Sequence, residues 1–279
     1  MNRWFDQLAS VDPIWLSLAP LIAVNLLFLI TLGTFRLIRH KRPRHEDVDR
    51  KEYSRFLSKF LVEYWYWLLG PVERGLARMK ISPDTLTLTG LAVSGIASYF
   101  FHRGMVGAGG WLMIFGATFD MLDGRVARLT NRESRSGAFF DSVIDRFSEA
   151  AVFLGLASWY RDSWVLYFVI LGLIGSMMVS YTRARGEGVG VKVTKGIMQR
   201  PERIVYLGVG SIFSPLFAYL FGRFYDLPPD FLTIAALVWI ACLTILGAIY
   251  RTQYVLIHLD PNPQDNRLFR RFVMRWVRF

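Results

Sequence analysis

The sequence is poor in the residues that form disulfides and soft-metal sites. It contains one cysteine, Cys242, so a disulfide within the chain and a cysteine-based metal site are both excluded. We expect Cys242 to serve packing inside an apolar helix. The chain also has no internal repeat and no low-complexity segment. Its few histidines are scattered and form no ligand pattern: His40, His45, His102 and His258.

Long polar stretches are also scarce. Hydrophobic residues make up 53% of the 279 residues, and the mean hydropathy is +0.31. This composition is too apolar for an ordinary soluble domain. A helix needs about 20 apolar residues to cross about 30 Å of hydrocarbon. Runs of that length predict seven spans, near residues 14–36, 82–102, 108–130, 136–159, 164–183, 203–222 and 230–257.

Basic residues are almost missing from one set of the predicted loops. Of the 33 Lys and Arg residues, that set holds only Arg3, Arg103, Arg161 and Arg223. This asymmetry follows the positive-inside rule and indicates a multi-pass protein of the cell membrane. The net charge of +11 therefore points to anionic lipid head groups as partners and argues against nucleic acid. The segments expected in the cytoplasm are 37–81, 131–135, 184–202 and the C-terminus.

These patterns predict an all-α integral membrane protein. Between the first span and the rest, aromatic and basic residues alternate in a way that suits a helix lying in the membrane interface. Packing of that helix on the rest of the protein stays an alternative, and Gly70-Pro71 is expected to break it. The regions are 1–51 (anchor helix and charged linker), 52–80 (amphipathic helix), 81–258 (six-helix membrane domain) and 259–279 (basic, aromatic tail).

Four aspartates stand in the most apolar half of the chain, where a carboxylate is costly and usually marks a site. Asp120 and Asp123 are three residues apart, Asp141 and Asp145 are four apart, and each pair shares one helix face. The short loop between the two helices makes them antiparallel neighbours, so the four carboxylates are expected to converge. Divalent cations such as Mg²⁺ or Mn²⁺ would relieve their repulsion. The alternative is pairing with nearby arginines, namely Arg125, Arg128, Arg132 and Arg146.

These residues belong to a motif that resembles the signature of the CDP-alcohol phosphatidyltransferases. The motif has eight positions within 26 residues: Asp120, Asp123, Gly124, Ala127, Arg128, Gly137, Asp141 and Asp145. The resemblance extends over residues 71–257 and implies the family's six-helix bundle. The interfacial helix and one additional N-terminal transmembrane helix would precede that bundle. It also implies a transferase that moves a phosphatidyl group from a CDP-linked lipid to an alcohol and releases CMP.

The resemblance further implies what individual residues do. The four aspartates would hold two divalent ions, Mg²⁺ or Mn²⁺, against the diphosphate of CDP-diacylglycerol or a similar lipid. Asp145 would act as the general base. The implied contacts with the CDP-lipid are Ser82, Pro83, Asp84, Thr85, Thr87, Asp120, Gly124, Ala127, Arg128, Ser134 and Gly137. Read without the motif, Ser82-Pro83 is also an ordinary helix start.

A second stretch bears on the acceptor. The segments SYTRARGE (180–187) and QRPER (199–203) resemble the phosphatidylinositol phosphate synthases of bacteria and their archaeal counterparts. This implies inositol 1-phosphate as the acceptor, and arginine suits its phosphate because the guanidinium binds in a bidentate fork. Contact of the loop with lipid head groups is the plainer alternative. The implied phosphate ligands are Arg183, Arg185, Arg200 and Arg203.

Alternatives to this function remain at the sequence level. Gly186, where those synthases more often have alanine, and the basic segment 191–195 depart from the pattern. Another acceptor, such as glycerol 3-phosphate or free inositol, therefore stays open. A cation-binding membrane transporter without enzymatic activity would instead distribute its acids through the bilayer depth. The family resemblance leaves a homodimer open as the assembly, with the active site facing the cytoplasm.

Overall fold

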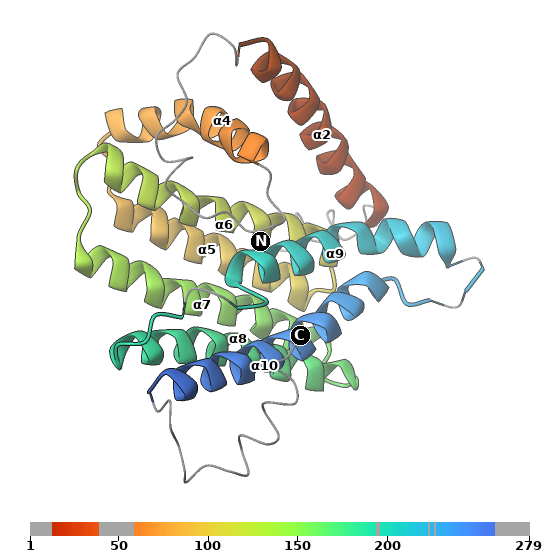
Figure 1. Cartoon of the computed structure of the whole chain (residues 1–279). Helices are drawn as coiled ribbons and strands as arrows, with labels where there is room; N and C mark the ends of the chain where they lie inside the picture. Colours follow the sequence, from red (N-terminus) through yellow and green to blue (C-terminus); the bar gives the residue numbers. More distant parts are fainter. Residues whose placement is uncertain (1–12, 39–58, 194–195, 223, 226, 260–279) are drawn as a thin grey trace. The chain divides into compact units, whose positions relative to one another are not determined.

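The computed structural model describes residues 13–38, 59–193, 196–222, 224–225 and 227–259. Within these ranges the regular secondary structure is helical, and no strand is present (Figure 1). The charged linker and the C-terminal tail lie outside the described residues. The helices are α2 (Pro13–Ile38), α4 (Lys59–Arg78), α5 (Pro83–His102), α6 (Val106–Leu129), α7 (Arg135–Trp159), α8 (Val165–Gly188), α9 (Arg200–Phe221) and α10 (Phe231–Leu259).

Every predicted span corresponds to a helix whose ends lie within a few residues of the expected ones. Hydropathy separates these helices further. Among the described residues, only α8, α9 and α10 combine a length and a composition apolar enough to cross a bilayer. The α6 and α7 helices carry the four aspartates and several arginines, whose charges lower the hydropathy of both. The chain is therefore a membrane protein whose three most apolar helices, α8 to α10, come after the acid-bearing helices α6 and α7 in the sequence.

The expected break at Gly70-Pro71 was wrong, because α4 continues through it to Arg78. Contacts on both sides of Gly70-Pro71 hold this continuous helix in place. Leu69 is buried in a cluster with α5 and α6 residues, and Glu73 forms a 2.5 Å ion pair with Arg125 of α6. Tertiary packing therefore outweighs the loss of one helical hydrogen bond at the proline.

The chain divides into two compact units, and α5, α6 and α7 each contribute to both. The first unit comprises the described residues of Met1–Val93 and Phe115–Asp145. Its core is a small cluster of Leu69, Leu86, Leu122 and Val126. In the same unit α2 contacts α4, where the hydroxyls of Thr31 and Tyr64 are 2.5 Å apart. This unit therefore contains the halves of α6 and α7 that carry the aspartates.

The second unit comprises Ser94–Ile114 and the described residues of Arg146–Phe279. Here α8 runs beside α10, and α9 also contacts α10 (Figure 1). Glycines allow close approach: a Cβ on Gly110 of α6 would lie 2.7 Å from the Gly208 carbonyl oxygen of α9. Small residues of this kind are the usual way in which membrane helices pack closely.

One polar contact closes the end of the second unit at the α7–α8 turn. The Tyr160 hydroxyl donates a 2.7 Å hydrogen bond to Asp230, which precedes α10. Burial, the hydrogen bond to Asp230 and the negative charge of Asp230 raise the pKa of Tyr160 above its ordinary value. Tyr160 therefore stays protonated and keeps the turn tied to the start of α10.

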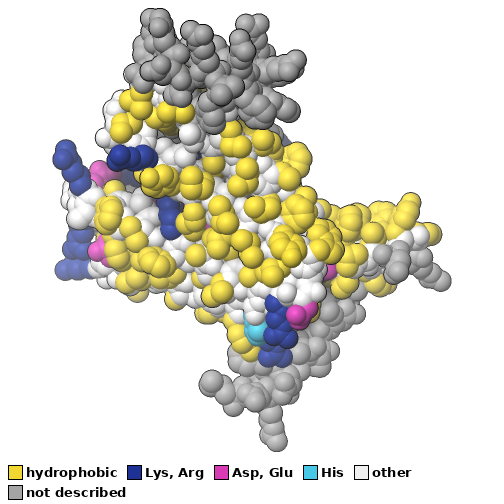
Figure 2. Space-filling view, turned by 90° about the horizontal axis from the view of Figure 1, so that it is seen from below, with side chains coloured by type: hydrophobic (Ala, Val, Ile, Leu, Met, Phe, Trp, Pro, Cys, Tyr) yellow, Lys and Arg dark blue, Asp and Glu magenta, His cyan; other side chains and the backbone are white. Residues whose placement is uncertain are grey.

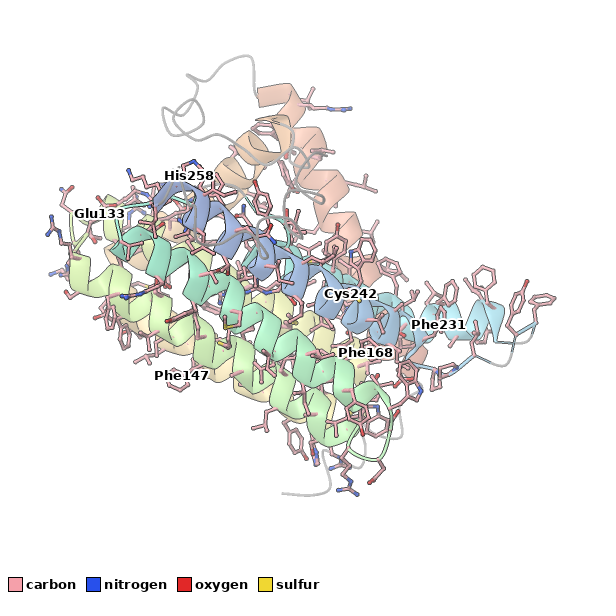
Figure 3. The ribbon with its side chains drawn as sticks, turned by 60° about the horizontal axis from the view of Figure 1, so that its bottom comes forward. Glu133, Phe147, Phe168, Phe231, Cys242 and His258 are labelled. Atoms are coloured by element: carbon pink, nitrogen blue, oxygen red, sulfur yellow. The ribbon has the colours of Figure 1, made fainter. Side chains whose placement is uncertain are left out.

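Large hydrophobic side chains are exposed along the apolar helices. Tyr167, Ile170 and Ile174 of α8 are all exposed, and Figure 2 shows hydrophobic side chains over much of the visible face. Phe147 likewise points away from α7 (Figure 3). Cys242 lies on α10 as expected but is exposed, so it does not pack in the protein core. Because lipid tails are apolar, such side chains suit the hydrocarbon environment.

Candidate active site and metal centre

Three of the four aspartates form a compact cluster in the first unit. Asp120 lies on α6, and Asp141 and Asp145 lie on α7; each offers one carboxylate oxygen, and these oxygens lie within 4.8 Å of one another. All three residues are half-buried. Charges this close repel strongly unless a cation lies between them. Carboxylate oxygens are the donors that Mg²⁺ and Mn²⁺ prefer, so the cluster fits a divalent ion.

Asp123 has a different environment from the other three acids. It is 4% exposed, and its Oδ2 accepts a 2.6 Å hydrogen bond from the Thr87 hydroxyl of α5. Its Oδ1 accepts a bond from the backbone N–H of Gly124. The expected convergence of four acids is thus seen as a cluster of three, with Asp123 fixed beside it by α5.

A cavity of about 710 Å³ opens next to these acids, also within the first unit. Its volume lies within the usual range of about 300–1,000 Å³ for small-molecule sites. Asp141 belongs to both the acid cluster and the cavity wall. The lining residues are Ser82, Pro83, Asp84, Thr87, Asp123, Gly124, Ala127, Arg128, Arg132, Glu133, Ser134, Arg135, Gly137, Ala138 and Asp141.

Two helix starts line this cavity, and a serine caps each of them. The Ser82 hydroxyl accepts a hydrogen bond from the Thr85 N–H at the start of α5. The Ser134 hydroxyl accepts one from the Gly137 N–H at the start of α7. A Cβ on residue 137 would lie 3.0 Å from that hydroxyl, a tight contact that would require the hydroxyl to shift. Helix N-termini carry partial positive charge, so the cavity wall suits a phosphate group.

Most of the residues predicted to contact a CDP-lipid line the cavity, but two do not. Asp120 lies in the acid cluster, and the Thr85 hydroxyl lies 2.7 Å from that of Ser82. Sequence reasoning also missed four lining residues of the α6–α7 loop and the start of α7. These four residues are Arg132, Glu133, Arg135 and Ala138. Their closeness in sequence to Ser134 could have indicated them, and Figure 3 shows Glu133 near the start of α7.

The alternative that the four aspartates pair with nearby arginines can be compared with the positions of three of those arginines. Arg125 forms a 2.5 Å ion pair with Glu73 of α4, and both side chains are less than a tenth exposed. Arg128 and Arg132 line the cavity. One of the four arginines therefore has a carboxylate partner outside the aspartate group, and two more face the cavity.

Arg203, predicted to bind an acceptor phosphate, is buried in the second unit. It is 2% exposed and forms a bidentate ion pair with Glu149 of α7. Its Nε donates to Oε1 at 2.6 Å, and its Nη2 donates to Oε2 at 2.9 Å. Its Nη1 also donates a 2.8 Å bond to the Met198 carbonyl. These contacts give Arg203 a clear structural task at the start of α9.

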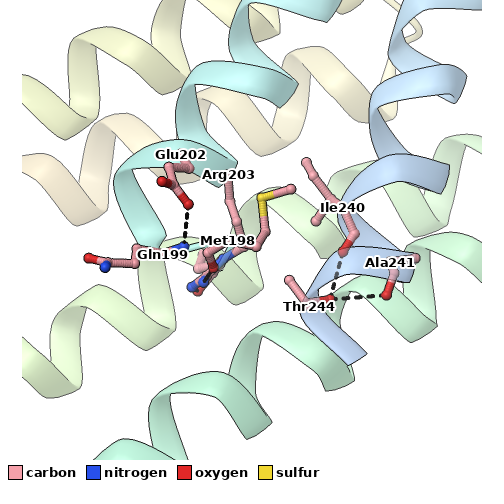
Figure 4. Close-up of polar contacts among 8 residues, drawn as sticks. Met198, Gln199, Glu202, Arg203, Ile240, Ala241 and Thr244 are labelled. Atoms are coloured by element: carbon pink, nitrogen blue, oxygen red, sulfur yellow. Dashed lines mark hydrogen bonds and ion pairs between the residues drawn. The ribbon is translucent and has the colours of Figure 1, made fainter. Parts of the chain in front are cut away.

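The start of α9 has further local supports. Glu202 accepts a 2.8 Å hydrogen bond from the Gln199 N–H, as one half of a capping box (Figure 4). Met198 has a φ of +57°, a left-handed conformation that is uncommon for a non-glycine residue. The Arg203 bond to the Met198 carbonyl helps to hold this turn.

The other predicted phosphate ligands belong to the same unit. Arg183 is exposed near the end of α8 and pairs with Glu187 at 3.1 Å, while Arg185 is exposed one turn from the helix end. Arg200 begins α9 and is half-buried. These three arginines flank the loop between α8 and α9.

Comparisons with known proteins agree with the motif. Residues 80–250 match the family model described as CDP-alcohol phosphatidyltransferase. The chain is 36% identical over 152 residues to a phosphatidylinositol phosphate synthase of Mycobacteroides abscessus, covering 53% of this chain and 69% of that protein. It is 40% identical over 148 residues to an archaetidylinositol phosphate synthase of Pyrococcus horikoshii, covering 52% and 78% respectively.

Solved structures give the same result. The fold is similar to that of a Mycobacterium tuberculosis phosphatidylinositol phosphate synthase with CDP-DAG bound, at a TM-score of 0.58 and 30% identity, covering 66% of this chain and 92% of that one. The structure of that synthase with manganese and citrate gives a TM-score of 0.59 and 29% identity, covering 67% and 88%. The similarity thus includes structures with a metal and with a CDP-linked lipid.

Proposed function

The chain belongs to the CDP-alcohol phosphatidyltransferase family, and we propose that its reaction joins a CDP-linked lipid to inositol 1-phosphate. The products are phosphatidylinositol phosphate and CMP. The observation that carries this proposal is the acid cluster of Asp120, Asp141 and Asp145 beside a cavity that shares Asp141 with it. Relatives named phosphatidylinositol phosphate synthase and archaetidylinositol phosphate synthase support the choice of acceptor.

We assign the divalent ions to the four aspartates, with Mg²⁺ or Mn²⁺ as the metal and two ions as the number. Asp120, Asp141 and Asp145 supply a shared set of oxygens, and Asp123 adds a carboxylate that Thr87 holds in place. When bound, such ions stabilise the negative charge that develops on phosphate oxygens during transfer. The manganese-bound relative supports this assignment.

The cavity takes the CDP part of the lipid in this proposal. The capped starts of α5 and α7 offer backbone N–H groups to its phosphates, and Arg128 adds a bidentate donor. The predicted contacts that line the cavity remain assigned to the CDP-lipid, and Arg132 and Arg135 join them. The relative solved with CDP-DAG supports this use of the cavity.

Asp145 is the general base of the proposed reaction. Its carboxylate accepts the proton of the acceptor hydroxyl as that oxygen attacks the phosphorus attached to the lipid. A phosphorus–oxygen bond to the acceptor forms, the bond to CMP breaks, and CMP leaves with the electron pair. A base needs to lie within hydrogen-bond reach of the hydroxyl, and Asp145 is one of the clustered acids beside the cavity.

We assign the acceptor phosphate to the arginines around the α8–α9 loop. Arg183, Arg185 and Arg200 flank that loop, and Arg203 anchors the start of α9 through Glu149. The basic residues of the 184–202 region favour a cytoplasmic location by the positive-inside rule. The active site therefore faces the cytoplasm in this proposal.

An acceptor screen tests the function. Purified protein in detergent is given CDP-diacylglycerol and Mg²⁺ or Mn²⁺, with inositol 1-phosphate, glycerol 3-phosphate or inositol as separate acceptors. We expect CMP release and a phosphatidylinositol phosphate product, identified by mass spectrometry, with inositol 1-phosphate only. A chelator should abolish the release, and added metal should restore it. A product formed only with glycerol 3-phosphate would contradict inositol 1-phosphate as the acceptor. Metal-dependent transport without release of CMP would contradict an enzymatic function.

A further inference from the structure

A buried ion pair joins α4 to α6, the helix that carries Asp120 and Asp123. The Arg125 Nε lies 2.5 Å from the Glu73 Oε1, and both side chains are less than a tenth exposed. Glu73 precedes the residues 80–250 that match the family model, whereas Arg125 lies within the motif segment. The pair therefore ties a helix outside the matched residues to the helix that carries half of the motif acids.

Arg125 lies on a side of α6 that faces away from the cavity. The α6 residues that line the cavity are Asp123, Gly124, Ala127 and Arg128. They share one face, because successive residues of an α-helix turn by about 100°. Arg125 falls outside that face, on the side that meets α4. A rotation of α6 that pulled Arg125 away from Glu73 would therefore also turn the cavity-lining side chains.

An apolar cluster also holds this part of α6. Leu122 and Val126 pack with Leu69 of α4 and Leu86 of α5. Apolar contacts are non-directional, so a helix can bury the same side chains in more than one rotation. A buried ion pair adds little net stability, because taking two charges out of water is costly, but it requires one distance and one direction. The pair therefore specifies the rotation that the cluster alone leaves open.

The other end of α4 is fixed to α2 in the same unit. The Thr31 hydroxyl lies 2.5 Å from the Tyr64 hydroxyl, and the rings of Phe35 and Tyr64 pack edge to face with their centroids 5.7 Å apart. Phe35 and Tyr64 are both buried. The Trp67 ring adds a second aromatic contact, 5.5 Å from that of Phe35. Helix α4 thus connects α2 at one end to α6 at the other.

We propose that Glu73 is a positioning residue for the CDP-linked lipid. Through Arg125 it sets the rotation of α6, so that Asp123 and Arg128 face the cavity. The contacts between α2 and α4 keep Glu73 in place for this task. The inference rests on the proposed function, since it takes the CDP-linked lipid as the occupant of the cavity.

The test separates the orientation of α6 from general stability. The full chain in detergent carries Glu73→Gln, which removes the negative charge opposite Arg125, or Glu73→Met/Arg125→Leu, which removes both charges and keeps apolar packing. Replacing both members of a buried pair is often neutral, so the double variant should unfold near the wild-type temperature, whereas Glu73→Gln should unfold at a lower one.

Both variants should raise the KM for CDP-diacylglycerol about tenfold, because a displacement of about 1 Å in a site can cost about 10²-fold in rate. The KM for inositol 1-phosphate should change less than about twofold. Asp162→Asn is the matched control, because it breaks an exposed ion pair with Arg161. It should leave both KM values and the unfolding temperature unchanged.

A wild-type KM for CDP-diacylglycerol in the stable double variant would overturn the inference and restrict the pair to stability. Equal increases in both KM values would overturn it as well. Thermal protection of the full chain by CDP-diacylglycerol with Mn²⁺ gives a readout that needs no turnover, and the double variant should need about tenfold more lipid for half-maximal protection. That shift, without turnover of inositol 1-phosphate by the wild type, would contradict the proposed reaction and support the role of Glu73. Turnover by the wild type, with unshifted protection in the double variant, would contradict the role of Glu73 alone.

Discussion

At the scale of single residues, the four aspartates of one motif have different environments. Asp120, Asp141 and Asp145 share a half-buried cluster, whereas Asp123 is buried and bonded to Thr87. The three clustered carboxylates are close enough to hold a divalent ion between them, and Asp123 is held in one orientation by its hydrogen bond. The motif therefore places three acids in one half-buried cluster and a fourth in a buried hydrogen bond to α5.

Asp145→Asn tests the general base. The amide keeps the size of the side chain but cannot accept the proton of the hydroxyl, so kcat should fall by about 10²- to 10⁴-fold. Binding of the CDP-lipid should persist, as measured by its protection of the full chain against thermal unfolding. Turnover close to that of the wild type would show that another group takes the proton.

Thr87→Val tests the hydrogen bond that fixes Asp123. The substitution keeps the volume but leaves a buried carboxylate without its donor, which should lower the free energy of unfolding by about 1–3 kcal/mol. Thr89→Val is the matched control on the same helix, because the Thr89 hydroxyl bonds only locally to the Thr85 carbonyl at 2.7 Å. Denaturant unfolding in detergent measures both variants. Equal losses would mean that the bond to Asp123 contributes nothing specific.

At the scale of helices, buried ion pairs join the elements that carry the site. Glu73 of α4 pairs with Arg125 of α6 in the first unit, and Glu149 of α7 pairs with Arg203 of α9 in the second. Each pair is nearly inaccessible to solvent. Removing one member leaves a buried charge, whereas replacing both with apolar residues is often neutral.

The Glu149–Arg203 pair allows structure and function to be separated. Glu149→Gln should lower the free energy of unfolding by about 3–5 kcal/mol, and the double variant Glu149→Leu/Arg203→Met should recover most of that stability. If Arg203 serves the acceptor phosphate, the recovered variant still has a raised KM for inositol 1-phosphate. Unfolding and steady-state kinetics on the same preparations measure the two effects. If the stable double variant has the wild-type KM for inositol 1-phosphate, Arg203 serves only to stabilise the fold through Glu149.

At the scale of the whole molecule, charge and hydropathy set the relation to the membrane. The helices α8, α9 and α10 are apolar enough to span it, and basic residues concentrate on one side of the predicted spans. Because Cys242 is the single cysteine of the chain, replacing it gives a background in which cysteines introduced elsewhere report the orientation by chemical labelling.

A pair of cysteine variants in a Cys242→Ser background tests the orientation. The variants are Asp162→Cys and Gly188→Cys. Asp162 precedes α8, and Gly188 is its last residue, where a side chain would meet open space. By the positive-inside rule, an impermeant maleimide should label Asp162→Cys in intact cells and Gly188→Cys only after lysis. The opposite pattern would place the proposed active site on the outer side of the membrane.

The sequence alone determined the helices, their order and the acid motif. Hydrophobic runs and three- and four-residue spacings act within one helix, so they can be read locally and agreed with α5 to α10 within a few residues. The motif also led to the family, which the comparisons confirmed.

Only the tertiary structure decided how distant residues pair. It separated Asp123 from the acid cluster, gave Arg203 the partner Glu149, and joined Glu73 of α4 to Arg125 of α6. It also carried α4 through Gly70-Pro71 and exposed Cys242. These outcomes depend on packing between residues that are often more than fifty positions apart. A local pattern carries no information about such contacts, since their energies arise only when the helices meet.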